Sequence, residues 1–238
     1  MIRGYKGKKG QSFVELAIVL PLLLFMLIGF VEVGALIYNY LSILDASREA
    51  ARFASEHDPE ILEVAGAGGH CEDDNLHFYQ DTACVITDPD FNPGLTLDPA
   101  TDDVTISIFW VKGNTFDPSG ADGDKRLPDD GDGVWSKYSD NWTKNCYGTI
   151  HSTTPFMQNA EVNDKLSTMV AAGTPTPPPD KGMVLVEVYF CHHNILGLPL
   201  LDQFIPDPIR LHAYTFMPAP QVQPTPTPIT PSAPTSTP

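Results

Sequence analysis

The sequence predicts an α+β protein in which a long apolar N-terminal helix crosses a membrane and precedes a small domain with an antiparallel sheet. Three observations support this fold class: an uncharged run from Leu16 to Val31, three later segments that either alternate in polarity or are rich in β-branched and aromatic residues, and a Pro/Thr-rich end at 218–238. The 238 residues include 14 Lys+Arg against 30 Asp+Glu. The resulting net charge of −16 argues against a nucleic-acid partner, which needs a basic surface.

The apolar segment is long enough to cross a bilayer and to continue beyond it. Glu32 is its only charge between Leu16 and Leu44. As a helix, Leu16–Val31 rises roughly 24 Å and Leu16–Leu44 roughly 43 Å, against a hydrocarbon core of about 30 Å. The leader, 1–10, holds four basic residues and no acidic one on the N-terminal side of this segment. We therefore expect a single pass through the cytoplasmic membrane, with the N-terminus inside and the acidic remainder outside.

The residues after the helix predict a mixed domain and an extended tail. The helical pattern runs to about His57, and a second short helix is expected at 59–65. Strands are expected at 104–111, 183–191 and 209–217, and another helix at about 161–172. The tail has no charge and little apolar surface, which predicts disorder. The expected units are a leader (1–10), a membrane helix with its outer extension (11–57), an outer α+β domain (58–217) and the tail (218–238).

Four cysteines lie on the predicted outer side. An oxidising compartment favours disulfides, and of the three possible pairings we favour Cys71–Cys84 with Cys146–Cys191. Zinc, bound by Cys191 with the neighbouring histidines, is the weaker alternative because no C-x-x-C is present.

An acidic, glycine-rich loop at 117–133 is a candidate Ca²⁺ site. Its carboxylates are hard oxygen ligands on a flexible segment, although the spacing differs from an EF-hand. A solvated acidic loop is the alternative. The candidate ligands are Asp122, Asp124, Asp130 and Asp132.

A processing motif lies where the leader meets the apolar run. Gly10 is followed five residues later by Glu15, a G-x-x-x-x-E spacing that resembles the type IV prepilin cleavage pattern. This resemblance implies that a prepilin peptidase cuts between Gly10 and Gln11. Glu15 would then either extend to the cytoplasmic headgroups or pair with the new N-terminal amine of a neighbouring subunit.

The segment from Gly10 to Ser55 resembles the TadE-like family of tight-adherence (Tad) pilus systems. Three blocks occur in the family's order, with Ser47 and Ala50 as departures in the last. The matching residues are Gly10, Gln11, Val14, Glu15, Ala17, Val19, Leu20, Pro21, Gly29, Glu32, Gly34, Ala46, Arg48, Glu49, Ala51, Arg52 and Ala54.

This resemblance implies a pilin-like fold and a pseudopilin or minor pilin that assembles or decorates a Tad pilus in adhesion or secretion. An extracellular filament is a second location that the resemblance implies, besides the membrane. The implied partners are the prepilin peptidase, other pilin-like subunits, membrane platform proteins and membrane lipid. No catalytic motif is present, so we expect no enzyme. The alternative is a membrane-tethered binding module with a Ca²⁺-stabilised domain that acts outside any filament.

Overall fold

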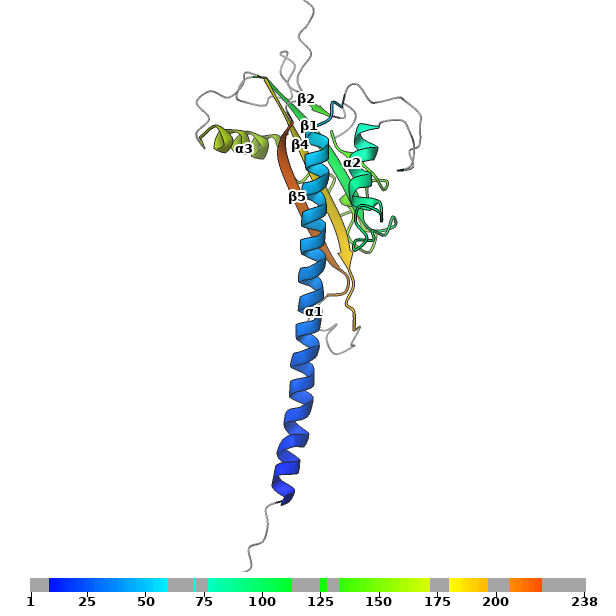
Figure 1. Cartoon of the computed structure of the whole chain (residues 1–238), viewed down its shortest axis with the longest axis vertical. Helices are drawn as coiled ribbons and strands as arrows, with labels where there is room; N and C mark the ends of the chain where they lie inside the picture. Colours follow the sequence, from blue (N-terminus) through cyan, green and yellow to red (C-terminus); the bar gives the residue numbers. More distant parts are fainter. Residues whose placement is uncertain are drawn as a thin grey trace, which may run out of the picture.

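The computed structural model describes residues 9–59, 71, 77–112, 125–127, 133–171, 180–196 and 206–219. It confirms the α+β class: one long helix leads into a domain built on an antiparallel sheet (Figure 1). The elements are α1 (Lys9–Ser55), α2 (Phe78–Thr87), β1 (Asp103–Lys112), β2 (Lys125–Leu127), β3 (Trp135–Ser136), a 3₁₀ turn η1 (Asn141–Thr143), α3 (Asn159–Ala171), β4 (Asp180–His192) and β5 (Ile209–Ala219).

Helix α1 is the longest element and has two structurally different halves. Its 47 residues correspond to roughly 70 Å of helix. The first half extends away from the domain, whereas the second half lies alongside the sheet (Figure 1). Pro21 lies inside the helix, which apolar membrane helices tolerate better than soluble ones.

The sheet is antiparallel, with strand order β2-β1-β4-β5, and β3 also pairs with β1. β4 is central: it pairs with β1 from Asp103↔Tyr189 to Lys112↔Asp180, and with β5 from Gly182↔Ala219 to His192↔Ile209. The end of β4 lies beside the middle of α1, where Asn39 bonds His192 (Figure 1). Ala219 pairs with Gly182 at the opposite end of β4.

The main core lies between the sheet and the two helices α1 and α2. Alternate residues of each long strand point into it, since side chains along a strand alternate between faces. Small residues on α1 allow the helix to approach the sheet closely, and all are at most 2% exposed: Ala46, Ala50, Ala51 and Ala54.

A second, smaller core covers the other face of the sheet. Phe109 from β1 and Met183 and Leu185 from β4 pack there against Met157 and Val162. Figure 1 accordingly shows α2 and α3 on opposite sides of the sheet.

The three predicted long strands correspond to β1, β4 and β5, and the predicted helix at 161–172 corresponds to α3. Helix α2 and the short strands β2 and β3 were not predicted. The expected helix at 59–65 and the tail lie outside the described residues, apart from Pro59 and the last two residues of β5.

Candidate functional site

The first half of α1 exposes apolar side chains on every face. Side chains from Phe13 to Val31 include many that are more than half exposed, among them Phe13 at 74% and Phe30 at 78%. Phe13–Ser55 is long and apolar enough to cross a membrane, and its most apolar 18-residue window has a mean hydropathy of 2.7. Water would not favour this surface over a length of several turns, whereas lipid or neighbouring helices would. The helix therefore fits a single-pass membrane anchor.

The predicted processing residues lie at the start of this anchor. Gly10 and Gln11 belong to the first turn of α1, and Glu15 follows about one turn later on the exposed surface. All three are thus in helical backbone at the membrane end of the molecule, far from the domain.

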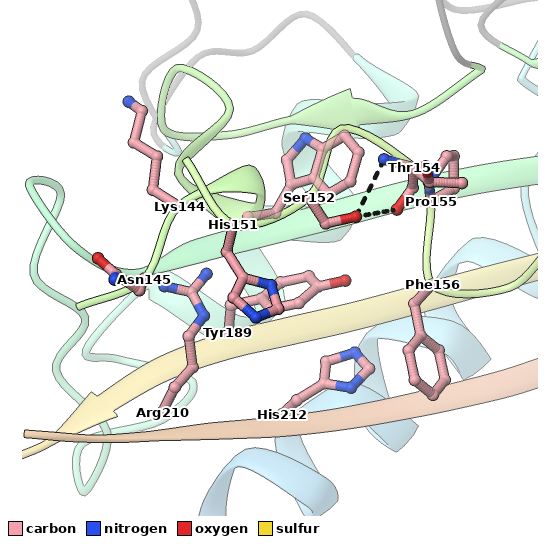
Figure 2. A pocket seen from close by; sticks show the side chains of 11 residues that line it. Lys144, Asn145, His151, Ser152, Thr154, Pro155, Phe156, Tyr189, Arg210 and His212 are labelled. Carbon is pink, nitrogen blue, oxygen red and sulfur yellow. Dashed lines mark hydrogen bonds between the residues drawn. The ribbon is translucent and has the colours of Figure 1, made fainter. Parts of the chain in front are cut away.

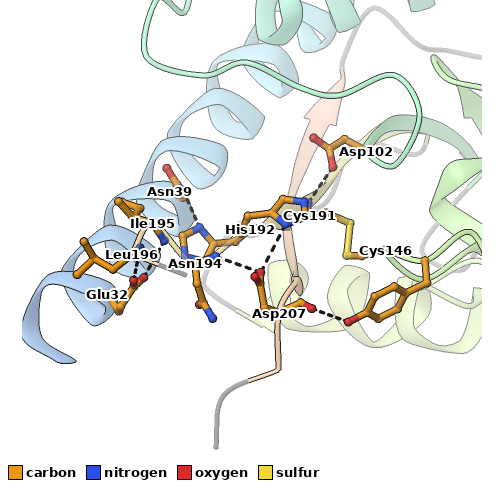
Figure 3. A network of polar contacts seen from close by, with 12 residues as sticks. Glu32, Asn39, Asp102, Cys146, Cys191, His192, Asn194, Ile195, Leu196 and Asp207 are labelled. Atoms are coloured by element: carbon orange, nitrogen blue, oxygen red, sulfur yellow. Dashed lines mark hydrogen bonds and ion pairs between the residues drawn. A yellow bond between two sulfur atoms is a disulfide. The ribbon is translucent and has the colours of Figure 1, made fainter. Parts of the chain in front are cut away.

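Glu32 joins the anchor to the outer domain, although it lies within an apolar helix. Its two carboxylate oxygens accept hydrogen bonds from the backbone N–H groups of Ile195 (3.0 Å) and Leu196 (2.6 Å), just beyond β4 (Figure 3). The side chain is only 4% exposed. A hydrogen bond to a charged acceptor contributes about 1.5–3 kcal/mol, so this contact is a strong link between segments 163 residues apart.

His192 provides a second link two turns further along α1. The Asn39 side-chain amide donates to His192 Nδ1 at 2.8 Å, which requires a neutral ring with its proton on Nε2 (Figure 3). Burial lowers the pKa of His192, and this outweighs the opposing effect of the Glu32 and Asp207 carboxylates. The ring is therefore held in the neutral form that the hydrogen bond needs.

Asp207 connects the end of β4 to the start of β5. Its carboxylate accepts from the Asn194 N–H at 3.1 Å and lies 3.4 Å from His193 Nδ1, and its carbonyl accepts from the Tyr147 hydroxyl at 2.6 Å (Figure 3). Together with Glu32 and His192, these contacts join the residues that follow β4, 193–196, to Asp207 before β5 and to α1. We call this set the junction: Glu32, Asn39, His192, Ile195, Leu196 and Asp207.

Both disulfides have the pairing favoured from the sequence. Cys71–Cys84 ties α2 to the segment before it, and Cys146–Cys191 ties the segment after η1 to the end of β4. Because Cys191 is in a disulfide, its thiolate is not available as a ligand, and the zinc alternative is wrong. Asp102 supports the same strand end by accepting from the Cys191 N–H at 2.8 Å, and burial raises the pKa of its carboxyl.

A pocket of about 530 Å³ opens on the face of the sheet opposite α1 (Figure 2). Its walls combine the rings of Trp142, Phe156 and Tyr189 with the cationic groups of Lys144 and Arg210. The described residues that line it include no Asp or Glu, in a chain with a net charge of −16.

Beneath this pocket, a fully buried carboxylate organises the floor. Glu187 accepts from His212 Nε2 at 3.1 Å, from the Tyr189 hydroxyl at 3.3 Å and from the Thr105 hydroxyl at 3.3 Å. Burial and the adjacent carboxylate both raise the pKa of Tyr189, so its hydroxyl remains a proton donor. Arg210 lies over the Tyr189 ring and donates to the backbone carbonyls of Thr101 and Asn141.

The candidate Ca²⁺ ligands Asp122, Asp124, Asp130 and Asp132 lie outside the described residues, so that prediction stays open. Sequence reasoning also missed the junction. Glu32 carried a signal, a lone charge in an apolar helix, but its partners are backbone groups that any residue supplies.

Comparison with known protein families gives a match for one segment of the chain, at its N-terminal end. The sequence model of the family described as TadE-like protein matches residues 10–52, which form α1 up to its last turn and include Glu32. No curated protein matches the chain, and no solved structure does so either. The matched segment agrees with the resemblance noted from the sequence, and it supports a role associated with Tad pili.

Proposed function

We propose that this TadE-like chain is a pseudopilin or minor pilin, anchored in the cytoplasmic membrane, that acts in the assembly or decoration of a Tad-type pilus. The proposal depends mainly on the structure of α1. The residues that match the family form one continuous helix whose first half is apolar and exposed and whose second half is part of the domain core.

Such a helix can exchange one apolar environment for another. In the membrane its exposed side chains contact lipid, and in a filament the same side chains contact the helices of neighbouring subunits. Membrane helices associate through close packing rather than a hydrophobic driving force, and Gly29 and Gly34 leave open space on the helix surface for this. Other pilin-like subunits, platform proteins of the membrane and the prepilin peptidase are the partners in this proposal, and adhesion or secretion is the outcome.

The proposal places the leader in the cytoplasm and the domain outside. Basic residues at the N-terminal end favour this orientation, and two disulfides in the domain suit an oxidising compartment. The role is structural, and the proposal assigns the chain no catalytic activity.

The direct test is the N-terminus of the mature protein. We expect a full-length chain produced together with its Tad system to begin at Gln11, as measured by mass spectrometry of the purified protein. A strain without the prepilin peptidase should yield the uncut chain. A mature protein that retains Met1 in the complete strain, or that is cut beyond Leu44, would contradict the proposal.

Glu15 tests the step after cleavage. If its carboxylate pairs with the N-terminal amine of a neighbouring subunit, Glu15→Ala should still insert in the membrane but should be lost from sheared filaments. Asp45→Asn on the exposed part of α1 is a matched control for loss of a carboxylate. Normal incorporation of Glu15→Ala would exclude the pairing.

The pocket favours a second candidate, a membrane-tethered binding module that acts outside any filament. Aromatic walls with cationic groups suit a small ligand that has a ring and a negative charge. Thermal shift measurements with glucuronate, and with glucose as the neutral control, test this candidate. A rise in melting temperature with glucuronate alone supports it, and identical melts with both sugars exclude this ligand class.

A further inference from the structure

The segment that follows β4 begins by placing two apolar side chains beside the membrane helix. Ile195 is 63% exposed and Leu196 is 43% exposed, although their backbone N–H groups are both bound to Glu32. We call these two residues the tip. The tip is therefore fixed to α1 through its backbone, while its side chains remain available to another surface (Figure 3).

The position of Glu32 along α1 defines where this surface lies. From Phe13, where the segment that is apolar enough to cross a membrane begins, to Glu32 the helix rises roughly 29 Å, which is close to the thickness of a bilayer's hydrocarbon core. Tyr38 and Tyr40 follow on the exposed surface at 59% and 41%. Tyrosines are enriched at the interface between hydrocarbon and water, so this arrangement puts Glu32 at the outer boundary of the membrane.

At this depth the Glu32 contacts satisfy two requirements at once. A backbone N–H without a partner costs several kcal/mol in hydrocarbon, and a lone carboxylate is also unfavourable there. The Ile195 and Leu196 N–H groups donate to the Glu32 carboxylate, so the amides and the carboxylate are paired with one another. Backbone could otherwise not approach lipid with its amides unpaired, whereas at Ile195 and Leu196 the amides are paired and the exposed side chains are apolar.

We propose that Ile195 and Leu196 insert into the outer leaflet and form a second membrane contact of the domain, beside α1. The partner is the lipid bilayer. Two contacts at separate points restrict the rotation of the domain about the helix axis, so the domain has one preferred face toward the membrane. The inference needs the membrane anchor only and does not depend on a role in pili.

Fluorescence quenching by brominated lipids tests the contact. The full chain is placed in nanodiscs, and tryptophan is introduced at the tip as Ile195→Trp, with the three native tryptophans measured in the unsubstituted chain as background. Arg52→Trp is the matched control, because Arg52 is exposed on the same helix roughly 30 Å further from the membrane. We expect lipids brominated near the headgroup to reduce the added fluorescence at least twofold for Ile195→Trp and to leave that of Arg52→Trp unchanged.

Leu196→Trp gives an independent reading if the first variant is poorly folded, and near-UV circular dichroism checks the fold of each. Quenching at both tip positions supports insertion in lipid. Equal, weak quenching at the tip and at Arg52→Trp would overturn it. The fluorescence of the introduced tryptophan could instead change only when two copies share a nanodisc, with no effect of brominated lipid. That result would show that the tip contacts another protein chain, and it would also overturn the proposal.

Discussion

Replacing Glu32 with Gln is expected to release the tip from α1 without unfolding the domain. Glu and Gln have nearly equal helix propensity, so the change leaves α1 itself intact. Gln retains one oxygen acceptor and introduces an NH₂ group in place of the other oxygen. One of the two bound amides, Ile195 or Leu196, would then face a second donor instead of an acceptor.

The expected loss follows from these two contacts. Each charge-assisted bond contributes about 1.5–3 kcal/mol, and a neutral replacement contributes about 0.5–1.5 kcal/mol. One bond is lost and the other is weakened, so we estimate that local opening becomes easier by about 2–3 kcal/mol. At 1.4 kcal/mol for each tenfold change, the open population rises roughly 30- to 150-fold.

Hydrogen exchange of the tip amides measures this population directly. The full chain in nanodiscs is labelled, and the Ile195 and Leu196 amides are resolved by fragmentation in the mass spectrometer. Asp45→Asn removes an exposed carboxylate of the same helix and should leave the tip unchanged. Unchanged tip exchange in Glu32→Gln would refute the role of the carboxylate, and an equal increase throughout β4 would show that the whole domain, not the junction, depends on Glu32.

Two further predictions concern the stability of the domain. Replacing Cys146 and Cys191 with Ala should lower the free energy of unfolding by about 4 kcal/mol in urea titrations, because this disulfide closes a loop with a sequence separation of 45. Replacing Cys71 and Cys84, with a separation of 13, should lower it by about 3 kcal/mol. Equal losses for the two disulfides would contradict the loop-length argument. The free energy of unfolding should also fall as the pH is lowered through about 6.5, because the unfolded chain takes up a proton that burial denies to folded His192. His192→Asn should lose part of this pH dependence in urea titrations between pH 7.5 and 5.5, and an unchanged slope would assign it to other groups.

The long elements could be predicted from the sequence because each has a strong local pattern. Helix α1 contains a long apolar run, β1 and β5 alternate in polarity, and β4 is rich in β-branched and aromatic residues. Periodicity of this kind depends only on the geometry of one element and on which face is buried. The presence of disulfides similarly required only the compartment and the even number of cysteines, whereas the pairing was a choice among three.

The missed elements depend on distant parts of the chain. Helix α2 has 10 residues, too few for a stable isolated helix, and it forms where Phe78 and Ile86 are buried and Cys84 is cross-linked. Strands β2 and β3 have three and two residues and are defined by pairing with β1. The junction was missed for the same reason, because the acceptors and donors that meet at Glu32 have no local signature.

The parallel course of α1 beside β4 and β5 has a mechanical consequence. The helix contacts the domain from Glu32 to Ala54, a distance of roughly 33 Å along its axis (Figure 1). A tension that pulls the domain away from an anchored α1 therefore acts as shear, and the contacts along this length must break together rather than in sequence. Forced unfolding is governed by the unfolding rate, and shear geometry keeps that rate low. In the filament that we propose, the appendage under flow would be expected to bend or to lose whole subunits before this helix slides out of its own domain.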